Sequence, residues 1–99
     1  MKYVIINDKK YELLKNYKDG YDYDEISNKM TDYFDAYDYI VGDWAYGKLR
    51  LKGFCKKENK IFNELNDFSN LEEYIKNNCA YECRYFVLER IEEVEDAKN

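Results

Sequence analysis

Residues 37–55 read YDYIVGDWAYGKLRLKGFC, and this stretch has the pattern of a β-hairpin. Alternation with a period of two on both sides of Gly47 is typical of strands that have two different faces. Gly47 stands where a tight turn requires a residue that tolerates a left-handed backbone. Gly42 and Gly53 lie inside the strand patterns, where glycine marks a bulge or the close approach of another group. We therefore expect two antiparallel strands joined at Gly47, with the rest of the chain arranged around them.

The second half of this hairpin separates basic from apolar side chains. Arg50 and Lys52 alternate with two leucines, so we expect one buried face and one face exposed to water. Cations beside exposed aromatic rings form a surface that suits a protein partner, and also single-stranded RNA, whose bases stack on rings. The candidate contact set is Asp43, Trp44, Tyr46, Arg50 and Lys52.

Charge is unevenly distributed along the chain. Residues 48–60 hold six basic residues and one acid, a local charge of +5, whereas the whole chain has a formal charge of -5. The remaining residues therefore carry -10, which repels a polyanion that comes within a Debye length of ~8 Å. This favours a protein over RNA as the partner. Lysines on an edge strand also prevent aggregation, which would explain the basic strip without any partner.

Three longer strings of the chain are similar to those of a known family. The hairpin string YDYIVGDWAYGKLRLKGF, the opening KYELLKNYKDGYDYDEI and the later NNCAYECRYFVLER resemble the YutD-like family of small bacterial proteins. The likeness covers most of the chain. Ala45 stands where the family is expected to have Gly, and Glu82 departs from its usual small residue. The resemblance implies a compact α+β domain and supplies no catalytic residues.

The segments before the hairpin predict a first pair of strands and a helix. Residues 2–6 and 11–17 have strand patterns and are joined by four polar residues. Asp22, followed three residues later by Glu25, has the form of a capping box, so a helix should begin there. Its apolar stripe, which we expect to pack on a sheet, is formed by Ile26, Met30, Tyr33, Phe34 and Tyr37.

The segments after the hairpin predict a weak strand at residues 60–65, a second helix and a last strand. Ser69 and Glu72 have the form of a capping box, and the inner face of the helix that follows holds Leu71, Tyr74, Ile75 and Cys79. Residues 84–91 contain a continuous apolar run, which is typical of a strand covered on both faces.

These elements predict one α+β domain over residues 1–91. We expect a mainly antiparallel sheet of about five strands that carries two helices on one face. From residue 92 onward acids predominate, so we expect residues 92–99 to form a disordered tail.

The composition excludes several chemistries. The chain has no His, which removes the commonest general base, the usual serine and cysteine triads and most catalytic zinc sites. The spacing of the glycines matches no phosphate-binding loop. Asp43 beside Trp44 is the one carboxylic acid that we would consider for a proton-donating role. Asp residues more often end strands or form turns, so we expect neither enzymatic activity nor a cofactor.

Cysteine usage and hydropathy indicate the compartment. Three Cys and no export signal favour free thiols in a reducing environment. Cys79 and Cys83 are spaced CxxxC and lack a second pair of ligands, so we expect packing residues rather than a metal or redox site. The apolar run at residues 4–6 is too short for a signal peptide, and no window approaches ~18 apolar residues. We expect a cytoplasmic protein that does not associate with membranes.

The sequence thus predicts a small cytoplasmic, non-catalytic binding or regulatory module. It would dock an unknown protein partner through residues 37–55. RNA or ribosome binding through residues 44–60 is the alternative, and a small enzyme that uses Asp43 is a third interpretation.

Overall fold

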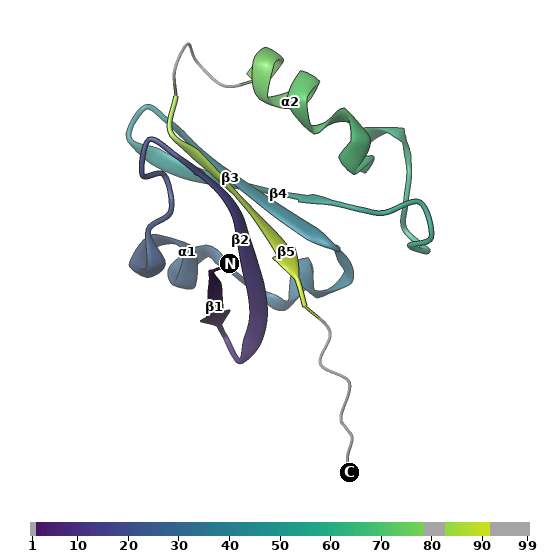
Figure 1. Ribbon diagram of the computed structural model, residues 1–99, viewed down its shortest axis with the longest axis horizontal. Coiled ribbons are helices and arrows are strands. Elements are labelled where there is room, and N and C mark those ends of the chain that lie inside the picture. The colour runs from purple at the N-terminus through teal and green to yellow at the C-terminus, as the bar shows by residue number, and fades with distance from the viewer. Residues whose placement is uncertain (1, 79–82, 92–99) are drawn as a thin grey trace.

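The computed structural model describes residues 2–78 and 83–91 of the 99-residue chain. Its centre is an antiparallel five-stranded sheet in the order β1-β2-β5-β3-β4 (Figure 1). The strands are β1 (Tyr3–Ile6), β2 (Lys9–Tyr17), β3 (Tyr39–Ala45), β4 (Lys48–Phe54) and β5 (Tyr85–Arg90). The α-helices are α1 (Tyr23–Lys29) and α2 (Leu71–Asn78), and the 3-10 helices are η1 (Asp32–Ala36), η2 (Glu64–Asn66) and η3 (Phe68–Asn70). The α+β class and the antiparallel sheet are confirmed.

Both hairpins close through two residues with a left-handed backbone. Asn7 and Asp8 have φ angles of 51° and 68°, and Tyr46 and Gly47 have φ angles of 54° and 74°. Positive φ at both central residues marks the type I′ turn, whose twist matches that of the paired strands. The predicted turn at Gly47 is confirmed. The first hairpin is tighter than predicted, because β2 begins at Lys9.

β5 lies inside the sheet, as its continuous apolar run predicted. It pairs with β2 on one side and with β3 on the other. Phe86, Val87 and Leu88 are buried in succession. Because side chains alternate along a strand, Phe86 and Leu88 belong to one core cluster and Val87 belongs to another.

The two helices cover opposite faces of the sheet, so the prediction that both lie on one face is wrong (Figure 1). Ile26 of α1 packs in the cluster that contains Ile40. Tyr74 of α2 packs against the cluster that contains Val41, the next residue of β3. The first five residues of β3 are buried in succession, and such a strand requires cover on both faces. The prediction that the hairpin strands are half-buried is therefore wrong for β3.

The predicted long helical stripe is divided between two elements. Asp22 caps α1 by accepting a hydrogen bond from the amide of Glu25, as predicted. The helix then ends at Lys29, and η1 begins after Thr31, whose hydroxyl oxygen accepts from the amide of Tyr33. A side chain that can bond the backbone locally favours such a restart. Phe34 and Tyr37 still reach the core, whereas Tyr33 is 67% exposed.

Residues 60–65, all of them described, form no strand, so the weak strand predicted there is wrong. Asn63 and Asn66 instead form a capping box around η2, each side chain accepting from the other residue's amide. Asp67 caps η3 by accepting hydrogen bonds from the amide and the hydroxyl of Ser69. The capping box predicted at Ser69 is therefore wrong. Short polar side chains satisfy these amides locally and outcompete strand pairing.

The cysteines differ in state. Cys55 is a buried free thiol whose pKa is raised by burial. Cys83 is disulfide-bonded, so the expectation of free thiols is wrong for this residue. With three cysteines, at least one cannot be paired within the chain, but the other two can form a disulfide. Cys79 and the acidic residues 92–99 lie outside the described residues.

Candidate functional site

The five residues of the predicted contact set do not share one face of the hairpin. Asp43, Arg50 and Lys52 lie on the face that α2 covers, because Arg50 contacts the carbonyl of Asn78 and Lys52 contacts the ring of Tyr74. The two remaining residues lie elsewhere: Trp44 packs against the core on the α1 face, and Tyr46 lies in the turn.

Asp43 and Arg50 form a bidentate ion pair across the two strands of the hairpin. Arg50 Nε donates to Oδ1 of Asp43 and Nη2 donates to Oδ2, both at 2.9 Å. Nη2 also donates to the carbonyl oxygen of Asn78 at 2.9 Å. The hydrogen bond to Asp43 raises the pKa of Arg50. Both carboxylate oxygens are engaged, so this pair joins the hairpin to the end of α2.

Trp44 also has a structural role. Its Nε1 donates to the carbonyl oxygen of Gly20 at 2.8 Å, and the guanidinium of Arg84 lies 4.3 Å from the centre of its ring system. The indole therefore fixes the loop before α1 to the end of the hairpin. It does not present an open ring to a partner.

Two residues of the predicted set, Tyr46 and Lys52, form no hydrogen bond or ion pair within the described part of the chain. Tyr46 is 103% exposed, so its ring buries no area against the chain. Lys52 Nζ lies over the rings of Phe54 and Tyr74, at 5.2 and 5.8 Å from their centres. Within the described residues, no carboxylate forms an ion pair with Lys52. A hydrated ammonium group at a sheet edge can bind a carboxylate from another molecule.

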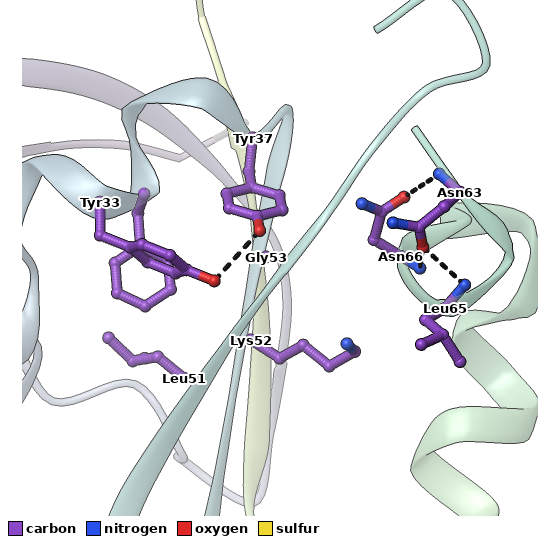
Figure 2. A pocket seen from close by; sticks show the side chains of 9 residues that line it. Tyr33, Tyr37, Leu51, Lys52, Gly53, Asn63, Leu65 and Asn66 are labelled. Atoms are coloured by element: carbon purple, nitrogen blue, oxygen red, sulfur yellow. Dashed lines mark hydrogen bonds between the residues drawn. The ribbon is translucent and has the colours of Figure 1, made fainter. Parts of the chain in front are cut away.

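A groove of about 240 Å³ lies beside residues 51–53 of β4 (Figure 2). Figure 2 shows Tyr33 and Tyr37 on one side of the strand and Leu65 on the other. Leu65 is 82% exposed. The lining residues are Tyr33, Phe34, Tyr37, Leu51, Lys52, Gly53, Asn63, Leu65 and Asn66.

Tyr37 explains why Gly53 is a glycine. A Cβ at position 53 would lie 2.3 Å from Cγ of Tyr37, so only glycine leaves room for the ring. The hydroxyl groups of Tyr33 and Tyr37 are hydrogen-bonded at 3.2 Å. This hydrogen bond, together with burial, raises the pKa of Tyr37 to about 12. This wall of the groove is therefore an aromatic surface in which the phenol of Tyr37 is neutral at neutral pH.

We expect the stability of the protein to fall as the pH rises from 10 to about 12. The pKa of Tyr37 is about 12 in the folded chain and 10.0 ordinarily, so the unfolded tyrosine loses its proton first. Its contribution is complete below pH 10 and is lost as the pH passes through the folded value. Urea titrations at stepped pH should show a shallower fall for Tyr37→Phe. An equal fall in wild type and Tyr37→Phe would contradict this, and Tyr46→Phe is the exposed control.

Comparisons with known proteins assign the chain to a family. A family model described as "YutD-like: Putative antitoxin YutD-like" matches residues 5–89. The chain belongs to the YutD-like family. "Putative antitoxin YutD" of Bacillus subtilis (strain 168) is 43% identical over 88 residues, which cover 89% of this chain and 97% of that protein. The solution NMR structure of protein yutD from B. subtilis matches with a TM-score of 0.77 and 40% identity, covering 99% of this chain and 89% of that one.

The groove of this YutD-like chain was not predicted. The sequence predicts Tyr33 and Tyr37 on a buried helical stripe and Leu65 in a weak strand. One signal was available, because Leu65 is the single apolar residue in the string NELND and follows no period. The lysines of this segment indicated an edge strand, and β4 is the edge strand, but no local pattern showed which distant residues line its outer side.

Two further properties of the described residues bear on this YutD-like domain. None of its helices has the length and apolar character needed to cross a bilayer. Within the same residues, no group of three or more Cys, Asp or Glu side chains could hold a metal ion.

Proposed function

We propose that this YutD-like chain is a small non-catalytic module that docks a protein partner through residues 37–55. Tyr46 is the observation that carries the proposal. Its position in a type I′ turn favours Asn, Asp or Gly, and a tyrosine with φ of 54° is strained there. The ring buries no area that would offset this strain. The side chain of Tyr46 does not stabilise the fold, so contact with another molecule would explain why a tyrosine occupies this position.

The geometry divides the predicted contact set into two groups. Asp43, Trp44 and Arg50 hold the hairpin rigid through their bonds to α2 and to the loop before α1. Tyr46 and Lys52 are presented to the partner. A rigid support reduces the entropy that a contact residue loses on binding, and an aromatic side chain can anchor an interface.

The descriptions "Putative antitoxin YutD-like" of the family and "Putative antitoxin YutD" of the B. subtilis relative support a function by contact with a partner. RNA binding through residues 44–60 is the alternative. It has less support because two of the six cations in the basic segment are paired within the chain, Arg50 with Asp43 and Lys56 with Glu89. These cations have less charge available for phosphates.

Tyr46→Asn tests the proposal. Asn tolerates a left-handed backbone, so we expect the free energy of unfolding to stay constant or to rise by about 0.5 kcal/mol. We expect recovery of the partner from a native lysate to fall about tenfold, since an aromatic anchor is worth more than 1 kcal/mol. Affinity purification with the wild-type and Tyr46→Asn chains, followed by mass spectrometry, measures this loss.

Tyr23→Asn is the matched control, because Tyr23 is 53% exposed on α1. It should retain the partner that Tyr46→Asn loses. A partner set that is the same for all three chains would disprove docking through the hairpin. A partner that nuclease treatment releases would favour the RNA alternative.

A further inference from the structure

We infer that the outer edge of β4 takes an extended segment of the partner protein as an additional strand, and that apolar and acidic side chains alternate in this segment. The inference rests on the proposed function and specifies how the partner is recognised. Addition of a strand to a sheet edge is a known mode of peptide recognition, in which the backbone supplies affinity and alternate side chains supply specificity.

The backbone of β4 is open along its outer edge. β4 is the last strand of the sheet, and the two-residue turn makes Ala45 and Lys48 the first hydrogen-bonded pair with β3. Alternation then directs the peptide groups of every second residue away from β3: Leu49, Leu51 and Gly53. Among the described residues, no backbone group of another element bonds to these three. Their donors and acceptors can pair with an added strand.

The same edge is already paired within the chain just after β4, at Cys55. The amide of Cys55 donates to the carbonyl oxygen of Asn66 at 2.7 Å, and the carbonyl oxygen of Cys55 accepts from the amide of Phe68 at 3.1 Å. These bonds form a parallel bridge between Cys55 and Asp67. The edge therefore has strand geometry where it is covered, and the open part ends at Gly53.

The walls of the groove determine which side chains an added strand carries. On one side of β4 lie Tyr33, Tyr37 and Leu51, which favour apolar residues. On the other side, Lys52 extends toward Leu65 (Figure 2). The ammonium of Lys52 lies over two rings and forms no ion pair within the described residues, so it favours an acid at the alternate positions. Because side chains of a strand alternate between faces, the segment alternates apolar and acidic residues.

A second copy of this chain does not fit the same edge. Antiparallel pairing of two β4 strands around Arg50 would place Lys48 opposite Lys52. Pairing around Leu51 would place Arg50 opposite Lys52. Like charges directly opposite each other destabilise a strand pair. The charge of this edge therefore favours an acidic partner over self-association.

A synthetic peptide in which valine and glutamate alternate tests the inference by NMR titration of the isotope-labelled full-length chain. We expect the amide resonances of Leu49, Leu51 and Gly53 to shift on binding. A peptide with lysine in place of glutamate should bind at least about tenfold more weakly. A peptide with N-methyl groups along one edge should lose a similar factor, because it cannot donate backbone hydrogen bonds.

Leu65→Asp should weaken binding of the valine–glutamate peptide at least about tenfold, because it places an acid on the side of Lys52, where it repels the glutamates of the peptide. Leu14→Asp is the matched control, since Leu14 is 44% exposed on β2, which β5 and β3 separate from β4. Binding that survives N-methylation, or that both variants weaken equally, would overturn the inference. Absence of shifts, with loss of the lysate partner in Tyr46→Asn, would overturn it and leave the proposed function intact. If Tyr46→Asn keeps the partner, the proposed function fails instead.

Discussion

Gly42→Ala should lower the free energy of unfolding by about 3 kcal/mol, at the upper end of the usual cost of overpacking a core. A Cβ at position 42 would lie 2.2 Å from Cζ of Phe86, the residue directly opposite on β5. The ring of Phe86 cannot move aside easily. It is fully buried, and the ring of Tyr21 packs edge-on against it at 5.5 Å. Domains of this size have only about 5 to 15 kcal/mol of stability, so a large fraction would be lost.

A double-mutant cycle separates this clash from other effects of alanine. Phe86→Leu shortens the side chain above position 42 and should cost about 1 kcal/mol by itself. In the Phe86→Leu background, Gly42→Ala should cost much less than in the wild type, which chemical denaturation would measure. Gly47→Ala is the control for backbone strain alone, because Gly47 has a φ of 74° and no atom within 4 Å of its Cβ position. Additive costs for Gly42→Ala and Phe86→Leu would contradict the clash.

Local patterns predicted the elements that depend on neighbouring residues. The turn at Gly47 follows from the conformation that glycine allows, and the start of α1 follows from the side chain of Asp22. The interior position of β5 follows from its continuous apolar run. Each of these signals acts within a few residues, so the sequence alone was sufficient.

Features that depend on distant parts of the chain were not predicted. Trp44 is of a residue type that often contacts partners. Its indole is instead engaged within the chain, by the carbonyl of Gly20 and the guanidinium of Arg84, which lie in other segments. The helices cover opposite faces because β5 enters beside β3 and both strands are buried on two sides. The groove at β4 results from the same strand order, since it is present only where the sheet ends.

Arg50→Leu should lower the free energy of unfolding by about 3 kcal/mol, the low end of the cost of breaking a buried ion pair. It would leave the carboxylate of Asp43 without either of its hydrogen bonds from Arg50, in a side chain that is only 2% exposed. The side chain of Arg50 is 48% exposed, so water can reach this site and partly replace the guanidinium, which limits the loss. Charge reversal, Arg50→Glu, should be worse because it sets a second carboxylate against the first.

The pair itself should contribute less than either single substitution suggests. Asp43→Val combined with Arg50→Leu removes both charges and places two apolar side chains at directly paired positions of β3 and β4. We expect the double variant to be at least about 1 kcal/mol more stable than Arg50→Leu alone, because no unpaired carboxylate remains buried. Urea denaturation of the four chains measures the coupling. A double variant no more stable than Arg50→Leu would show that the charges themselves hold the hairpin against α2.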